Sequence, residues 1–229
     1  ELARYIRTEL AENNEAELPV YVVYGVNRSV INVPLRIKEK HSFDRIDAYE
    51  KSSAGTDFRV FFEWFRNQED YENQVRAKRD ADYREDNFQD VNCEDASYKD
   101  ADYKTANYED PQLKAVRKAI YCFMPDLSNL MVERRPKLRM VITKNKVKLS
   151  MNQLSDAEKC YLAMIGDLAR RMAIANPQAD DALSCSGIVL IDEIELHLHP
   201  EWQRKIVPAL RCTFPNIQFI ITTHSPQVL

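Results

Sequence analysis

The stretch GIVLIDE at residues 187–193 and the stretch IQFIITTHSP at residues 217–226 decide the fold. Each begins with a continuous apolar run, which is typical of a strand buried on both faces of a parallel sheet. Between them, Pro200 opens a helix that we expect to run to about Leu210. A strand, a helix and a strand of this length predict a right-handed βαβ unit with parallel strands, and therefore an α/β fold.

Three polar side chains follow these two strands at the points where the strands end. Asp192 and Glu193 come directly after the first apolar run, and His224 comes soon after the second. Because parallel strands end at the same edge of a sheet, we expect the three side chains to converge where open α/β sheets bind ligands. Packing does not account for such a group of polar residues, so the pattern favours a functional site.

A well-capped helix precedes this unit. Ser155 and Glu158 have the spacing of a capping box, and apolar residues recur at helical spacing from 161 to 172 before Asn176-Pro177 ends the helix. The first N–H groups of a helix and a serine hydroxyl make a natural anion site. Capping boxes are common, so a purely structural cap remains the alternative.

The remaining segments predict further core elements. Residues 20–24 have the composition of a buried strand. Phenylalanines between residues 58 and 65 recur at helical spacing and predict a core-facing helix, whose charged continuation at 66–80 we expect to face solvent. The Asp-Pro pair at 110–111 predicts another helix start, and residues 131–150 have the pattern of strands separated by turns.

Residues 81–110 form six consecutive five-residue units: ADYRE, DNFQD, VNCED, ASYKD, ADYKT and ANYED. A period of five fits neither a helix nor a strand. The block resembles the pentapeptide-repeat family, whose units wind into a square β-helix, except that Tyr replaces Leu or Phe at most central positions. The alternative is an acidic, Tyr-rich loop. In either case we expect an insert that is separate from the rest of the fold.

Composition excludes several classes of protein. The 229 residues carry a net charge of −4 and contain no apolar run near the roughly 20 residues that a bilayer requires, so we expect no membrane partner. Residues 1–12 lack the apolar core of a signal peptide. Five scattered cysteines favour a reducing cytoplasm over a disulfide framework or a zinc ribbon. They are Cys93, Cys122, Cys160, Cys185 and Cys212.

The four glycines exclude one phosphate-binding motif from these residues. Gly25, Gly55, Gly166 and Gly187 are never followed by Lys, so no GxxxxGK[ST] loop (Walker A) is present. The chain opens at Glu1 and stops just after a strand-like run. We therefore expect it to be part of a longer protein.

Three motifs in the last third together resemble the ABC-ATPase superfamily, particularly the SMC, RecF and OLD-like heads. LSDAEK at 154–159 stands where those proteins carry an LSxGEx signature, IVLIDE at 188–193 matches Walker B, and ITTHSP at 221–226 matches the switch strand. The resemblance implies the C-terminal half of an ATPase head, with a parallel or mixed sheet and flanking helices. Ala157 departs from the signature glycine, and its Cβ puts close approach to a phosphate in doubt.

A longer resemblance is to the PtuA-type ATPases of Septu antiphage systems, whose relatives accompany some retrons. It covers VNRSVINVPLRI at 26–37, FFEWFRNQED at 61–70, NQLSDAEKC at 152–160 and the Walker B and switch regions. It implies a cytoplasmic ATPase that uses ATP and Mg²⁺, pairs through its heads into a homodimer or higher oligomer, and controls a PtuB-like HNH nuclease. Nucleic acid, or a reverse transcriptase with its RNA–DNA product, are further implied partners.

The resemblance also implies roles for individual residues. Asp192 would hold Mg²⁺, Glu193 would activate the attacking water, and His224 would sense the γ-phosphate. The signature segment would reach a nucleotide held by a second subunit, through Ser155 and the neighbouring Ala157 and Glu158. Residues 195–199 would fall in the loop at the dimer interface.

Two other functions remain open. His197 and His199 beside Asp192 and Glu193 could form the zinc or manganese site of a metallohydrolase, although that leaves LSDAEK unexplained. A nucleotide-dependent clamp with little or no hydrolysis is the other.

We expect residues 1–40 to belong to an ATPase lobe, residues 41–130 to be a helical region containing the 81–110 insert, and residues 131–229 to carry the signature, Walker B and switch segments.

Overall fold

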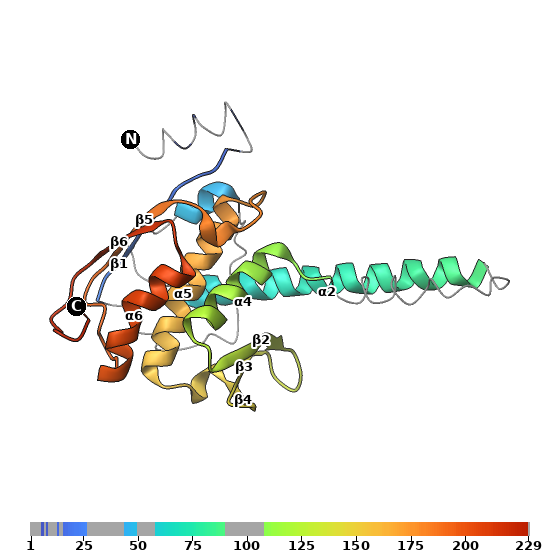
Figure 1. The fold of residues 1–229 in the computed structure, drawn as a ribbon. Coiled ribbons are helices and arrows are strands. Elements are labelled where there is room, and N and C mark those ends of the chain that lie inside the picture. Colours follow the sequence, from blue (N-terminus) through green and yellow to red (C-terminus); the bar gives the residue numbers. More distant parts are fainter. Residues whose placement is uncertain are drawn as a thin grey trace.

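A parallel sheet organises the chain. The computed structural model describes residues 6, 8, 13, 16–26, 44–49, 58–89 and 108–228, and only the backbone of residues 58 and 82–89. The sheet has the order β1-β5-β6, made of β1 (Val20–Tyr24), β5 (Gly187–Ile191) and β6 (Ile217–Ile221). Its register pairs Tyr24 with Ile191 and Ile191 with Ile221, so the three strands end at one edge. The predicted parallel βαβ unit is confirmed (Figure 1).

Three helices lie on one side of this sheet (Figure 1). They are α4 (Pro111–Phe123), α5 (Asp156–Ala175) and α6 (Pro200–Thr213). α5 is buried from Cys160 to Ala175 because it packs against α4, α2, β1 and the short 3-10 helix η1 (Arg45–Tyr49). Asp110 caps α4 and Pro111 opens it, as its sequence predicts.

The opposite face of the sheet differs from the prediction. Val23, Leu190 and Ile220 lie side by side across the three strands and are 40%, 39% and 49% exposed. Successive side chains of a strand point to opposite faces. Val22 and Val189, which point toward the helices, are buried. Among the described elements, the helices lie only on that side of the sheet. Within the described part of the chain, the strands are therefore buried on one face rather than on two.

The longest helix, α2 (Phe58–Gln89), projects away from the sheet (Figure 1). Its phenylalanines Phe61, Phe62 and Phe65 are buried, as predicted. Residues 81–89 form its last turns, so a solenoid does not begin at residue 81. Residues 90–107, which contain the rest of the five-residue units, lie outside the described residues.

The charged part of α2 is not wholly a solvated face, as the sequence suggested. Glu69 and Glu72 are only 5% and 1% exposed. Arg117 of α4 lies 3.1 Å from Glu72, and Arg134 lies 3.1 Å from Glu69. Burial raises the pKa of Glu69, although the Val132 N–H and the two arginines oppose that rise. These buried ion pairs attach the base of α2 to α4 and to the neighbouring strand.

That strand belongs to a second, antiparallel sheet in the order β2-β3-β4. Its strands are β2 (Leu127–Glu133), β3 (Arg139–Lys144) and β4 (Val147–Ser150). Asn145 and Lys146 form the predicted turn and both have positive φ, which suits a two-residue hairpin. Two further 3-10 helices, η2 (Met151–Gln153) and η3 (Ala182–Ser184), flank α5.

Candidate functional site

The first part of the site is the end of β5. Asp192 follows the strand directly, and its backbone N–H donates to the Tyr24 carbonyl oxygen at 2.8 Å. Glu193 then has a φ of 47°, in the left-handed region that residues other than glycine seldom adopt. This turn ends the strand and places the two adjacent carboxylates at the carboxyl edge of the sheet. Both positions were predicted from the sequence.

Thr222, at the end of β6, connects the two acidic residues. Its hydroxyl donates to Asp192 Oδ1 at 2.5 Å and accepts from the Glu193 N–H at 2.8 Å. Its carbonyl oxygen accepts from the N–H of Ile194 at 3.1 Å. A single residue therefore orients the Asp192 carboxylate and supports the left-handed backbone of Glu193. Sequence reasoning missed this role, although the motif ITTHSP contains the residue.

His224 completes the group, as predicted. Its Nε2 atom lies 3.8 Å from Glu193 Oε1, and its side chain is exposed. The loop that carries it is held from the other strand, because Glu195 Oε1 accepts the His224 backbone N–H at 2.5 Å. Slight burial works against ionisation of Glu195, but the Thr223 hydroxyl and backbone N–H groups outweigh it and lower its pKa. The ionised Glu195 carboxylate therefore positions the loop that carries His224.

The signature segment forms a separate part of the surface. Ser155 is the N-cap of α5, and its capping box with Glu158 is confirmed by bonds in both directions: the Ser155 N–H donates to Glu158 Oε2 at 2.9 Å, and the Glu158 N–H donates to Ser155 Oγ at 3.3 Å. A cavity of 410 Å³ adjoins this helix start, and its lining includes Ala157, His197 and Trp202. Neither Asp192, Glu193 nor His224 lines it.

The charge of Glu158 is already compensated within the chain. Lys144 Nζ lies 2.5 Å from its carboxylate, and the Ser155 hydroxyl donates to it at 2.8 Å. Partial burial disfavours the charged form, but Lys144 and Ser155 outweigh it and lower the pKa of Glu158. Lys159 similarly pairs with Asp156 at 2.7 Å. These two lysines reduce the repulsion that an incoming anion would meet at an acidic first turn.

The histidines of the loop do not form the suggested metal site. His199 is the N-cap of α6, where its Nδ1 accepts the Glu201 N–H at 3.4 Å. His197 has a φ of 66° and lines the cavity beside Ser155. Within the described ranges, no group of three or more His, Cys, Asp and Glu side chains could hold a metal ion. The described residues therefore do not support the metallohydrolase alternative.

One buried contact connects the two parts of the surface. The Tyr161 hydroxyl, on the second turn of α5, donates to the carbonyl oxygen of Ile194, directly after Glu193. Tyr161 is 1% exposed and stacks against Phe123. The sequence pattern identified Tyr161 only as part of an apolar stripe, because periodicity predicts burial but not the partner of a polar tip.

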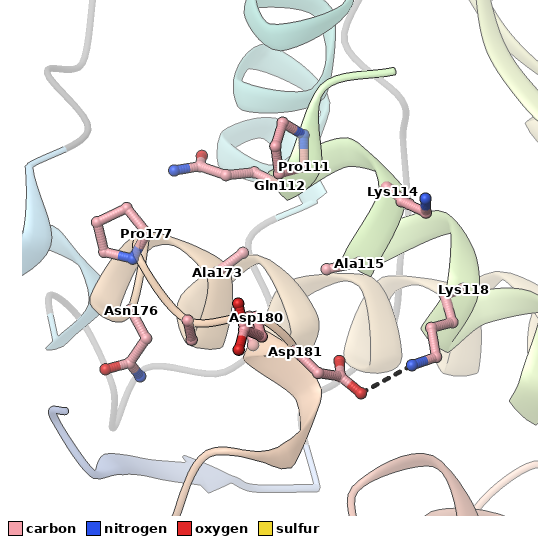
Figure 2. A pocket seen from close by; sticks show the side chains of 12 residues that line it. Pro111, Gln112, Lys114, Ala115, Lys118, Ala173, Asn176, Pro177, Asp180 and Asp181 are labelled. Carbon is pink, nitrogen blue, oxygen red and sulfur yellow. Dashed lines mark hydrogen bonds and ion pairs between the residues drawn. The ribbon is translucent and has the colours of Figure 1, made fainter. Parts of the chain in front are cut away.

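A second cavity, of about 180 Å³, lies at the other end of α5 (Figure 2). Ala173, Asn176 and Pro177 contribute to its lining, and Lys118 and Asp181 form an ion pair at its rim at 2.8 Å. None of the residues predicted to be functional lines this cavity.

Comparison with known proteins gives relatives for most of the chain. Residues 27–229 match the family described as "AAA domain, putative AbiEii toxin, Type IV TA system". The whole chain aligns with the retron Ec83 probable ATPase of Escherichia coli at 37% identity and with the retron Vc95 probable ATPase of Vibrio cholerae serotype O1 biovar El Tor at 36% identity, covering 48% of each relative. The chain thus spans about half the length of these curated relatives.

Two other similarities are more limited. The Septu protein PtuA of Bacillus mycoides is 43% identical over 76 residues, which is 33% of this chain and 10% of that protein. The match to a crystal structure of the Smc head domain of Pyrococcus furiosus, bound to the C-terminal domain of ScpA, covers 52% of this chain and 29% of that chain at 18% identity, with a TM-score of 0.37.

Within the described part of the chain, none of the helices combines the length and the apolar character that a membrane crossing requires.

Proposed function

The chain belongs to the family described as "AAA domain, putative AbiEii toxin, Type IV TA system", and we propose that it is part of an ATP-hydrolysing head in an antiphage defence complex. Support comes from its similarity to probable ATPases of retrons along its whole length and, over a shorter stretch, to a Septu protein. The observation that carries the proposal is the convergence of Asp192, Glu193 and His224 at one edge of a parallel sheet.

The donor set at this edge suits a magnesium nucleotide. Mg²⁺ prefers oxygen ligands and commonly takes only one or two protein carboxylates together with phosphate oxygens. Asp192 offers an exposed carboxylate that Thr222 orients. When bound, Mg²⁺ would neutralise negative charge between the phosphates and the two adjacent carboxylates, which otherwise repel each other. Asp192 is therefore assigned to the metal and Glu193 to the water.

Positioning provides most of the catalysis in this mechanism. Glu193, at the left-handed turn that follows β5, would accept a proton from the attacking water through its carboxylate. His224, 3.8 Å from Glu193, donates towards the terminal phosphate. The phosphate-binding loop would come from outside these residues, since their sequence contains no GxxxxGK[ST] motif.

The start of α5 would act on a nucleotide held by another subunit. Ser155 and Ala157 lie beside a cavity that Glu193 and His224 do not line. Free N–H groups and the positive end of a helix favour phosphate, so pairing of two heads would complete each site. The partners proposed on the Septu and retron resemblance are an HNH nuclease, nucleic acid and, in a retron, a reverse transcriptase with its RNA–DNA product.

The division of the chain at residues 40 and 130 remains part of this proposal, and so does a cytoplasmic location. The four described cysteines are free thiols, which fits a reducing compartment.

A clamp with slow hydrolysis is the second candidate, and Ala157 favours it. The residue lies in the first turn of α5 and lines the cavity there. Its Cβ occupies space that a glycine would leave open to a phosphate. Such a head would bind ATP and pair but turn over slowly.

Substitution of the two acidic residues tests the proposal in the full-length protein. Glu193→Gln keeps the shape of the side chain but removes the base, so hydrolysis should slow by about 10²-fold or more while ATP affinity is retained. Asp192→Asn should weaken Mg²⁺-dependent nucleotide binding itself. Steady-state ATPase assays and nucleotide titrations measure the two effects.

Gln178→Arg, at an exposed position beyond the other end of α5, serves as a control with both activities retained. Near-normal hydrolysis by Glu193→Gln would refute its assignment as the base. Slow hydrolysis in the unsubstituted protein, together with tight ATP-dependent pairing, would favour the clamp.

A further inference from the structure

Two cysteines that are distant in the sequence meet on the surface of the protein. Cys122 lies in the last turn of α4 and Cys212 in the last turn of α6, 90 positions later. Their sulfur atoms are 4.0 Å apart, and both residues are exposed. We propose that Cys122 and Cys212 are a modification site, at which a peroxide converts the two thiols into a reversible disulfide.

Contact between the two helices that carry the pair holds the two sulfurs close together. α4 and α6 contact each other directly, and Phe123 packs against Trp202 with ring centroids 6.5 Å apart. A disulfide needs sulfurs about 2 Å apart, so rotation of the two side chains must close the remaining distance. Because the helices are already in contact, this step does not require the chain to unfold.

The other described thiols lack this combination of features. Cys160 and Cys185 are 2% and 3% exposed. Burial raises the pKa of the Cys185 thiol to about 11, so very little of the reactive thiolate forms at neutral pH. Selectivity among the described cysteines therefore follows from exposure and from the presence of a second thiol within reach.

Thiol oxidation suits the pair better than metal binding. In the part of the chain that the structure describes, no third His, Cys, Asp or Glu joins the two sulfurs to make a metal-binding group. Structural zinc requires four such ligands. Exposed disulfides are the labile and regulatory kind, and in reducing compartments close thiol pairs commonly act as redox sensors.

The reaction balances with hydrogen peroxide as the oxidant. One thiol reacts with peroxide to give a sulfenic acid and water. The second thiol then attacks that sulfur, forming the S–S bond and releasing a second water. The two sulfurs together lose two electrons and two protons. Either thiol can take the first oxidation, because the other sulfur lies within reach to resolve the sulfenic acid.

The position of the bond gives it a structural consequence. α6 begins at Pro200, directly after the loop that carries Glu193 and Glu195, and α4 packs along α5, which begins beside Ser155. The disulfide ties the last turn of α4 to the last turn of α6. It therefore restrains α6, the helix that connects the two acidic residues to the histidine strand, although neither cysteine lines the cavity beside Ser155.

Peroxide treatment of the full-length protein tests this proposal independently of ATPase activity. Cys93 lies outside the described residues, so every variant carries Cys93→Ser. Mild peroxide should make the folded protein lighter by about 2 Da through loss of two hydrogens. Peptide mapping should show Cys122 linked to Cys212, and dithiothreitol should reverse the change. Cys122→Ser and Cys212→Ser should each abolish the link.

The single variants also test for the sulfenic acid that the first step forms. In Cys212→Ser, dimedone should trap a sulfenic acid on Cys122, because the resolving thiol is missing. Independent oxidation of both sulfurs to sulfinic acids, a link to a different cysteine, or no reaction at either sulfur would overturn the proposal. Cys122 and Cys212 are both exposed, and serine is similar in size to cysteine. Loss of folding therefore does not complicate the comparison.

Discussion

The backbone N–H of Glu193 donates a hydrogen bond to the hydroxyl of Thr222, from the end of one parallel strand to the end of the next, at 2.8 Å. The same hydroxyl donates to Asp192, so its two bonds fix the direction of its proton. A left-handed residue such as Glu193 carries a conformational cost of the order of 1 kcal/mol or more that its surroundings must offset. Thr222 provides part of that support.

Replacement of Thr222 should therefore reduce the rate of hydrolysis without unfolding the protein. Thr222→Val keeps the branched shape but removes the bridge between Asp192 and Glu193. We expect kcat to fall by roughly 10- to 100-fold, as for a loss of about 1.4 to 3 kcal/mol of positioning. Thr222→Ser retains the hydroxyl and should restore most of the activity. Equal activity in the Val and Ser variants would show that the bridge is not needed.

Ser155 should act on the nucleotide of a partner head. Ser155→Arg places a long charged side chain at the start of α5 and should prevent ATP-dependent pairing, which light scattering detects. Because it also removes an N-cap worth about 1 kcal/mol, Ser155→Asp is a second variant: aspartate also caps helices, but its charge repels phosphate and the Glu158 carboxylate that the Ser155 hydroxyl contacts.

Both Ser155 variants should remain folded and bind ATP within each subunit. Gln178→Arg, beyond the opposite end of α5, should pair normally and controls for added charge. Unchanged pairing by Ser155→Asp and Ser155→Arg would exclude a role in trans.

A buried charge cluster should make stability depend on Asp167. Its carboxylate is 1% exposed and lies 2.7 Å from both Arg170 and Arg171, with the Tyr24 hydroxyl 3.1 Å away. Asp167→Asn leaves two buried guanidinium groups without their anion and should cost about 3–5 kcal/mol of unfolding free energy. Asp156→Asn, at a fully exposed acid, is the matched control and should change stability little. Urea unfolding of both variants measures the difference.

The same cluster predicts a direction for pH dependence. Burial opposes ionisation of Asp167, but the two arginines outweigh it and lower its pKa. A lowered pKa in the folded state stabilises the protein fully above the unfolded value of about 3.9, and this stability is lost as the pH falls through the folded value. Acid unfolding of Asp167→Asn should thus be less steep below about pH 4. An identical acid unfolding profile for Asp167→Asn and the unsubstituted protein would contradict this.

The sequence by itself was sufficient to predict the local elements and the polar residues that follow them. The capping box of Ser155 and Glu158, the Asp-Pro start of α4 and the βαβ unit depend on neighbouring residues and on the periodicity of apolar positions. Parallel strands share an edge, so the convergence of Asp192, Glu193 and His224 also followed from sequence order. The five-residue period misled at residues 81–89, where helix α2 continues.

Only the tertiary structure decided which distant groups share a partner. It brought the Thr222 hydroxyl between Asp192 and Glu193, attached Tyr161 to the loop after Glu193, and buried Glu69 and Glu72 against Arg117 of α4. It also brought together two cysteines 90 positions apart and, among the described residues, left one face of the sheet exposed. Periodicity specifies which side of an element is apolar, but a hydrogen bond or a sulfur contact depends on the relative placement of two elements, which no local pattern contains.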